Sequence, residues 1–327
     1  MMAPSNPLPH SLPPDPDGID ALIAKAARLH SPPEVAQSLL NLTRDEDFDI
    51  REVVDCIRRD PAMSAKLLQV VNSSRYGLPA SVGNLHQAAA LLGQRTVRLL
   101  AMTFSIVNTF ATGAARSLYN DYLRSALTTA CGASRVNRRA TVLERKDAYT
   151  AGLLADVGIL VMAQADGDSY LSLYRDHRGS LLVEAEQARY GFDHAAVAAR
   201  LFQKWQFPGG VLSAVRRHHD EAVTEPIETA TYGGSLLAEA IWRKDAVVMD
   251  RCRGWLEAHF GIDIDRFLDL AIQCRDEVAL ELEVFGVDCD LSIDCRTLLE
   301  QARQQFITTS DDASSYDECP QSALTEV

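Results

Sequence analysis

The stretch that decides the fold begins Asp60-Pro61-Ala62-Met63-Ser64-Ala65-Lys66-Leu67-Leu68 and continues, after two residues, as Val71-Asn72-Ser73-Ser74-Arg75-Tyr76-Gly77-Leu78. Asp60 can cap a helix because its carboxylate accepts from free N–H groups, and Pro61 lacks the N–H that would have no partner in the first turn. Apolar residues then recur at helical spacing, at Met63, Leu67, Val70 and Val71. Asn72 and Ser73 fall where the helix gives way to a turn, and both can bond backbone groups there. The stretch predicts a capped amphipathic helix, in which Asp60, Pro61, Asn72 and Ser73 have structural roles.

The same helical period extends outward along the chain in both directions. It predicts helices over 19–29, 31–42, 50–57, 84–92, 96–110, 117–135, 146–163, 166–175, 179–190, 194–205, 210–219, 226–243, 247–259, 264–283 and 294–307. Gly93 suits the left-handed position that ends a helix. One stretch, 287–294, alternates as a strand does, but an isolated strand has no partner, so we interpret it as a linker. We therefore expect an all-α protein.

Composition excludes several classes of protein. The chain has 327 residues, 47% of them hydrophobic, and a formal net charge of −13, which argues against a general nucleic-acid binder. The longest apolar run, 151–163, is interrupted by Asp156 and is too short to cross a bilayer. The seven cysteines form no CxxC pair, and no signal peptide is evident, which argues against a secreted disulfide scaffold. We expect a cytoplasmic protein with mostly reduced thiols and no membrane partner.

Shifts in composition divide the chain into four parts. Residues 1–16 are rich in proline, and residues 308–327 contain five acidic residues and no Lys or Arg. Neither segment offers enough apolar surface to order itself. We expect a disordered head at 1–16, a main domain at 17–224, a helical extension at 225–307 and a disordered acidic tail at 308–327.

The opening stretch is the first of an ordered series of motifs. The others are His86–Gly93, Ala151–Gly158, Gly191–His194, Trp205–Pro208 and the pair His218-His219. In order and spacing, the series resembles the HDOD family, bacterial "HD-related output domains" that are distant relatives of the HD phosphohydrolases. The resemblance covers about 25–224. It implies an HD-like helical bundle, with 225–307 as its C-terminal helical extension.

HD phosphohydrolases hold a divalent metal with His and Asp ligands from several helices, and the resemblance maps only part of that set onto this chain. Arg124 stands where the first family histidine is expected, and Ala155-Asp156 stands at the His-Asp pair that names the superfamily. His194, His218 and His219 match histidines that bind a second metal in the cyclic-dinucleotide phosphodiesterase branch.

Two interpretations of this partial set are open. In the first, Asp156 and the three histidines bind a metal or an anion. In the second, Asp156 accepts bonds from a neighbouring histidine or from Arg124, as a relic network that fills the old metal cavity. A buried carboxylate must be paired, hydrogen-bonded or protonated in either case. Because Arg124 already supplies a positive charge, we favour the relic network and expect no cofactor, with a divalent metal as the alternative.

A second candidate site is a run of cations. Arg135, Arg138, Arg139, Arg145 and Lys146 place five positive charges within twelve residues. Such a patch could bind a phosphate or an acidic partner, or it could be a solvated loop. The sequence contains no GxSxG, GxxxxGK[ST] or GxGxxG motif.

The HDOD resemblance implies a signalling module without an established enzymatic activity. We expect a non-catalytic bacterial signal-transduction protein that contacts signalling proteins or a nucleotide ligand. The first alternative is a metal-dependent phosphohydrolase or cyclic-dinucleotide phosphodiesterase that uses Asp156, His194, His218 and His219. The second is a receptor that binds a cyclic dinucleotide without cleaving it, at Arg124 or at the cations of 135–146.

Overall fold

A computed structural model describes residues 16–29, 49–59, 61–72, 81–93, 97, 113–137, 139–205, 207–284, 287, 294–297 and 300–301. Throughout these residues the regular structure is helical, and no strand occurs in them, so the expected all-α class is confirmed. The elements are α1 (Pro16–Leu29), α3 (Ile50–Arg58), α4 (Pro61–Asn72), α5 (Leu85–Leu92), η2 (Gly113–Leu118, a 3-10 helix), α7 (Tyr119–Val136), α8 (Val142–Leu154), α9 (Val157–Asp166), α10 (Asp168–Asp176), α11 (Ser180–Tyr190), α12 (His194–Lys204), α13 (Gly209–Arg216), α14 (Pro226–Arg243), α15 (Ala246–Phe260) and α16 (Ile264–Val284).

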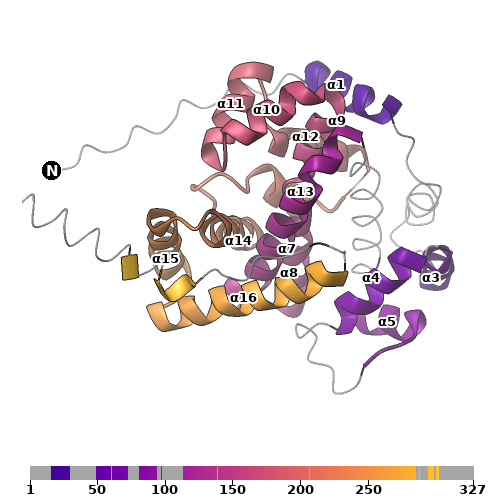
Figure 1. The fold of residues 1–327 in the computed structure, drawn as a ribbon. Helices are drawn as coiled ribbons and strands as arrows, with labels where there is room; N and C mark the ends of the chain where they lie inside the picture. Colours follow the sequence, from indigo (N-terminus) through magenta and orange to yellow (C-terminus); the bar gives the residue numbers. More distant parts are fainter. Residues whose placement is uncertain are drawn as a thin grey trace, which may run out of the picture.

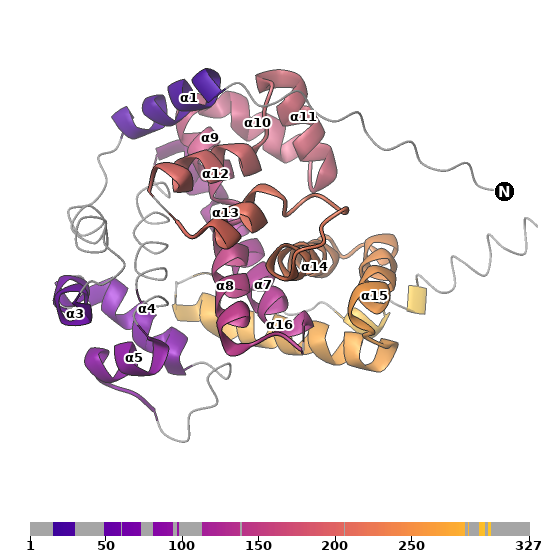
Figure 2. The same cartoon turned by 180° about the vertical axis from the view of Figure 1, so that it is seen from behind.

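Helices α3, α4 and α5 pack on one another and lie at one end of the molecule (Figures 1 and 2). Asn84 caps α5 by accepting from the backbone N–H of His86 at 2.8 Å. Gly93 ends α5 with a φ of 80°, a conformation that L side chains rarely adopt, so glycine is required there. Helix α1 lies apart from these three helices and packs against α9 and α12.

Asn72 has the structural role that the sequence indicates. Its side-chain amide donates to the carbonyls of Leu68 and Val82, each at 2.8 Å, and its Oδ1 accepts from the Val82 N–H at 2.7 Å. These bonds tie the end of α4 to the segment that leads into α5. Pro61 is the first residue of α4. Asp60 and Ser73 lie outside the described residues. The helix expected at 31–42 also lies outside them, as does the helix expected at 96–110 except for Val97.

The centre of the fold is a close packing of α7 with α8 and α14. Glycines allow the backbones to approach: a Cβ on Gly234 would lie 2.3 Å from the carbonyl oxygen of Thr129, and one on Gly152 would lie 2.8 Å from the Ala130 nitrogen. Because backbone atoms cannot yield as a flexible side chain does, each contact requires a residue without a Cβ. Helix α14 belongs to the expected extension 225–307, yet it packs directly on the central helices.

The predicted single helix over 146–163 is wrong: α8 ends at Leu154, and α9 begins at Val157. The chain turns at Ala155 and Asp156, and Asp156 has a φ of −91° and a ψ of 6°, outside the helical region. The apolar sequence continues across the break because both flanking segments are buried, so periodicity gave no sign of it. Because of this break, Asp156 lies between the two helices.

The helix predicted over 210–219 is shorter in the structure, since α13 ends at Arg216 and His218 and His219 lie in the turn that follows. The last predicted helix, 294–307, is represented by helical residues at 295–297, with Asp294 accepting from the N–H groups of Arg296 and Thr297. Most of the alternating stretch, the Pro-rich residues 1–15 and the acidic tail lie outside the described residues.

One segment of the described chain, Glu144–Asp166, has the length and composition of a membrane span, with a mean hydropathy of 1.4. It corresponds to α8 and α9 together, and 94% of its apolar window is buried inside the fold. A core helix passes the same test of length and composition, and the burial assigns this segment to the protein core.

Candidate functional site

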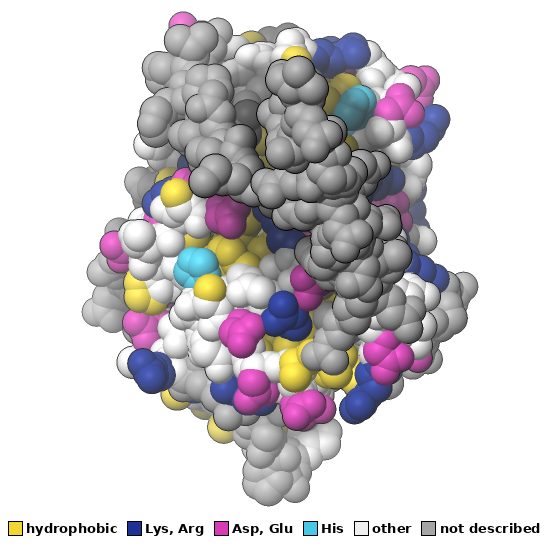
Figure 3. Space-filling model, turned by 90° about the vertical axis from the view of Figure 1, so that its left-hand side faces the viewer, with side chains coloured by type: hydrophobic (Ala, Val, Ile, Leu, Met, Phe, Trp, Pro, Cys, Tyr) yellow, Lys and Arg dark blue, Asp and Glu magenta, His cyan; other side chains and the backbone are white. Residues whose placement is uncertain are grey.

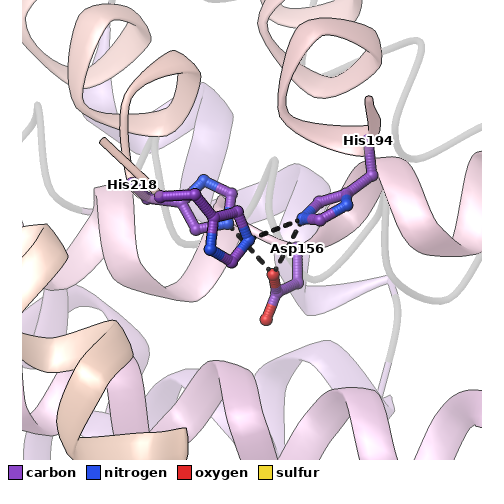
Figure 4. Close-up of side chains that lie close together, drawn as sticks. Asp156, His194 and His218 are labelled. Atoms are coloured by element: carbon purple, nitrogen blue, oxygen red, sulfur yellow. Dashed lines mark hydrogen bonds and ion pairs between the residues drawn. The ribbon is translucent and has the colours of Figure 1, made fainter. Parts of the chain in front are cut away.

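Four side chains from three parts of the chain meet at the break between α8 and α9. Asp156 lies in the break, His194 is the first residue of α12, and His218 and His219 follow α13. Their ligand-capable atoms all lie within 4.8 Å of one another. Figure 4 shows His194 and His218 directed at the carboxylate of Asp156 from opposite sides. The structure therefore brings together all four residues that the sequence singled out.

Gly158 sets the distance between two of these elements. A Cβ at this position would lie 1.9 Å from the carbonyl oxygen of His194, so the first turn of α9 touches the start of α12. Asp193 caps α12 by accepting from the Ala196 N–H at 2.7 Å, which fixes where that helix begins. Together, the glycine and the cap place the His194 ring beside Asp156.

Both oxygens of Asp156 have partners within the protein. Oδ1 lies 3.2 Å from Nε2 of His218 and 3.5 Å from Nε2 of His194. Oδ2 accepts from the Ser125 hydroxyl at 3.1 Å. Of the two partners that the sequence left open for Asp156, the structure has the histidines, because the Arg124 guanidinium instead pairs with Asp121 at 2.8 Å.

A second buried carboxylate, Glu186 of α11, holds the other side of His194. Its Oε2 lies 2.7 Å from His194 Nδ1 and accepts from the His194 backbone N–H at 2.9 Å. Its Oε1 accepts from the Tyr170 hydroxyl. Glu186 is wholly buried. Since a carboxylate accepts, Nδ1 of His194 carries a proton.

The hydrogen-bond partners of the rings fix a pattern of protons in the cluster. His218 Nδ1 lies 2.7 Å from the carbonyl oxygen of Val215, so both of its ring nitrogens face acceptor oxygens. His194 Nε2 lies 3.0 Å from His219 Nε2, and an N–H on His194 can donate there. A charged His194 ring would lie between the two carboxylates, Asp156 and Glu186.

The pKa shifts agree with this pattern. Burial opposes the charge on His194, but the carboxylates of Glu186 and Asp156 outweigh burial and hold its pKa well above the ordinary value. Burial likewise opposes the charge on Asp156, but hydrogen bonds from His194 and His218 hold its pKa well below the ordinary value. Burial, with the charges of His218 and His194, lowers the pKa of His219 well below its ordinary value, so His219 accepts as a neutral ring.

A pocket of about 280 Å³ opens in front of the cluster. Asp156, His194 and His219 line this pocket, together with Arg124, Arg178 and Trp242. The Arg124 guanidinium lies 5.0 Å from the centre of the Trp242 ring, and that of Arg178 lies 3.9 Å from the centre of the Tyr174 ring. The volume lies just below the usual range for ligand pockets, which is about 300–1,000 Å³.

The five cations of 135–146 have different surroundings. Arg135 is half-buried and pairs with Glu277, Lys146 donates to the Leu92 carbonyl at 2.7 Å, and Arg145 donates to the Ala140 carbonyl at 3.2 Å. Arg139 is exposed, and Arg138 lies outside the described residues. Three of the four described cations are thus bonded to parts of this chain. On the face in Figure 3, basic and acidic side chains are interspersed among the described residues.

Sequence reasoning missed three residues of the site: Ser125, Glu186 and Trp242. Ser125 directly follows Arg124, and a hydroxyl there gives no signal by itself. Glu186 lies near the exposed Glu184 and Arg189, a pattern typical of a solvated helix face. Trp242 lies in the expected extension 225–307, where the sequence predicts no site residue.

Fold and site define an all-α bundle with a partial HD-type His-Asp cluster. The HDOD domain family matches residues 29–221, and the chain belongs to this family. The chain is 24% identical over 202 residues to a curated protein of Treponema pallidum (strain Nichols), described as uncharacterized. That match covers 60% of this chain but only 39% of the relative, so the chain spans well under half of the relative's length.

Solved structures show the same fold at low identity. A protein from Shewanella amazonensis SB2B, named as a proposed phosphohydrolase, is 23% identical with a TM-score of 0.58, covering 80% of this chain and 98% of that one. An HDOD domain protein of unknown function from Geobacter sulfurreducens is 21% identical with a TM-score of 0.57, covering 82% and 99%. A protein from Marinobacter aquaeolei VT8, named as a proposed signal transduction protein, is 20% identical with a TM-score of 0.54, covering 83% and 64%.

Proposed function

We propose that this protein is a non-catalytic signal-transduction module of the bacterial cytoplasm. It acts through contacts with signalling proteins or through a small nucleotide ligand. The observation that carries the proposal is the closed set of partners at Asp156, whose two oxygens are already engaged by His218, His194 and Ser125. A buried carboxylate that already has partners within the protein does not need a metal ion to satisfy it, which supports a structural role.

The substitutions at two expected ligand positions support this proposal. Arg124 brings a permanent positive charge to the pocket in place of a histidine. Ala155 offers no side-chain ligand. The charged His194 ring and the Arg124 guanidinium already supply positive charge near Asp156, without a metal.

A metal-dependent phosphohydrolase is the second candidate, and a specific observation favours it. Nδ1 of His194 and Nδ1 of His218 are both held by acceptors, which directs both Nε2 atoms at the same point near Asp156. This is the arrangement in which histidines bind metals, with a carboxylate or a carbonyl behind each ring. The donor set therefore fits one divalent ion, held by Asp156 and the three histidines. Such an ion would polarise a phosphoryl oxygen and activate water.

The metal content of the purified protein separates the two candidates. We expect less than about 0.1 equivalent of Mn, Fe or Zn by elemental analysis, because the protonated His194 ring repels a cation and must lose a proton before it can bind one. We also expect no hydrolysis of nucleotide phosphodiesters. Near one equivalent of metal that disappears in the His218→Ala/His219→Ala variant, with hydrolysis abolished by Asp156→Asn, would establish the enzyme instead.

Nucleotide binding is tested by substitution of Arg124 in the pocket. If a nucleotide is the signal, Arg124 and Trp242 are the groups that would meet its phosphate and base. The small volume suits one nucleotide, or one half of a cyclic dinucleotide. We expect a mononucleotide or cyclic dinucleotide to raise the melting temperature of the wild type but not that of Arg124→Ala. The control is Arg175→Ala, an exposed arginine of α10 that does not line the pocket. The absence of any shift in the wild type would leave protein contacts as the mode of action.

A further inference from the structure

A second cluster of reactive side chains lies between the central helix α7 and the C-terminal helix α16. Cys131 and Arg135 are one turn apart on α7 and face Cys274 and Glu277 on α16. The two thiols are buried, with 2% and 0% of their residue surfaces exposed. This cluster is separate from the His-Asp site, and neither the family match nor the pocket explains it.

The two sulfurs are already close to bonding distance. Their separation is 3.2 Å, and a disulfide bond is about 2.05 Å long. The sulfurs must therefore approach by about 1.2 Å, a shift that side-chain rotation and a small movement of one helix can supply. The two cysteines are 143 residues apart in the sequence, so the sequence alone gives no sign that they are close in space.

The guanidinium of Arg135 activates the pair. It donates to the sulfur of Cys131 and forms an ion pair with Glu277. The hydrogen bond from Cys131 and the Arg135 charge outweigh burial and lower the pKa of the Cys274 thiol, whereas the pKa of the Cys131 thiol is raised by its bond to Cys274 and by burial. A thiolate is the nucleophilic form of cysteine, so Cys274 is the thiol that reacts first.

We propose that Cys131 and Cys274 are a modification site, at which a peroxide forms a reversible disulfide that ties α16 to α7. The Cys274 thiolate attacks hydrogen peroxide, giving a sulfenic acid and hydroxide, which takes up the proton that the thiol released. The Cys131 thiol then attacks the sulfenic sulfur, the S–S bond forms, and water leaves. In total, two thiols are oxidised to one disulfide and one peroxide is reduced to two waters.

The disulfide would link the extension to the helix that carries the pocket. Helix α7 supplies Arg124 and Ser125, and α16 belongs to the expected extension 225–307. In the cytoplasmic location that the proposed function assumes, such a bond would serve regulation by oxidants, because intracellular disulfides are mostly transient or redox-sensing. The inference does not depend on whether the His-Asp cluster binds a metal.

The test counts thiols in the full-length protein. After reduction and treatment with a small excess of hydrogen peroxide, we expect the wild type to lose two of its seven thiols, as titrated after denaturation. Trypsin should then release the peptides Ser125–Arg135 and Phe267–Arg275 as one disulfide-linked species, which dithiothreitol separates. The Arg135→Gln variant should oxidise at least several-fold more slowly.

Matched variants keep the result interpretable. Cys131→Ser and Cys274→Ser should each prevent the linked species. Cys252 on α15 is the matched control, because it is equally buried but is not part of the pair. Burial raises the pKa of the Cys252 thiol, so Cys252→Ser should leave the linked species unchanged. Seven intact thiols in the treated wild type, or a disulfide that maps to other cysteines, would overturn the proposal.

Discussion

Replacing Gly158 with alanine is expected to destabilise the protein by about 3 kcal/mol or more. The new methyl group would lie 1.9 Å from the carbonyl oxygen of His194, and a backbone carbonyl cannot rotate away as a side-chain end can. Helix α12 would have to move away from α9, which would separate His194 from Asp156. Urea unfolding followed by circular dichroism measures the loss of stability.

A second glycine provides the control for this prediction. A Cβ on Gly254, within α15, would meet no atom within 4 Å. Gly254→Ala should therefore stabilise the protein by up to about 1 kcal/mol through helix propensity. Equal urea midpoints for Gly158→Ala and the wild type would contradict the close approach of α9 to α12.

The sequence predicted the members of the His-Asp cluster but not its internal bonding. Asp156, His194, His218 and His219 were identified from motifs in a fixed order, and motif order survives where single residues change. The two options for the partner of Asp156 could not be separated, because the choice depends on which ring reaches it in space. The break at Ala155 was missed because the flanking segments are buried on all sides, so no polar face marks where one helix ends.

Other contacts could not be predicted because the partners are distant in the sequence. Cys131 is buried among apolar residues of α7, but its neighbour Cys274 comes from α16, 143 residues further along the chain. The cations of 135–146 are close in sequence, yet Arg135 bonds to α16 and Lys146 bonds to the end of α5. A run of like charges predicts a patch only when its residues share one surface.

The extension contributes directly to the pocket. The family match ends at residue 221, but Glu239, Trp242 and Arg243 of α14 line the pocket beside the His-Asp cluster. Helix α14 reaches this position because Gly234 lets it lie against α7. A ligand in this pocket would therefore touch both the matched domain and the helix beyond it.

Glu186→Gln is expected to cost about 3–5 kcal/mol, the range for removing one partner of a buried ion pair. Glutamine keeps the shape of the side chain but removes the charge that His194 faces at 2.7 Å. The matched control is Glu184→Gln, an exposed residue of the same helix, which should change stability by less than about 0.5 kcal/mol. Urea unfolding at several pH values, in the presence of a chelator, measures both variants.

The pH dependence separates a charge network from a merely steric role of Glu186. Because the folded-state pKa of His194 is raised above its ordinary 6.5, the charged ring adds stability that is fully present below pH 6.5. That stability disappears as the pH rises through the folded-state pKa. The loss caused by Glu186→Gln should therefore be largest below pH 6.5 and should shrink at alkaline pH. An equal loss at pH 6 and at alkaline pH would mean that Glu186 only fills space.

A metal centre has another signature: the chelator alone would destabilise the wild type, and Glu186→Gln would weaken metal binding about 10–100-fold.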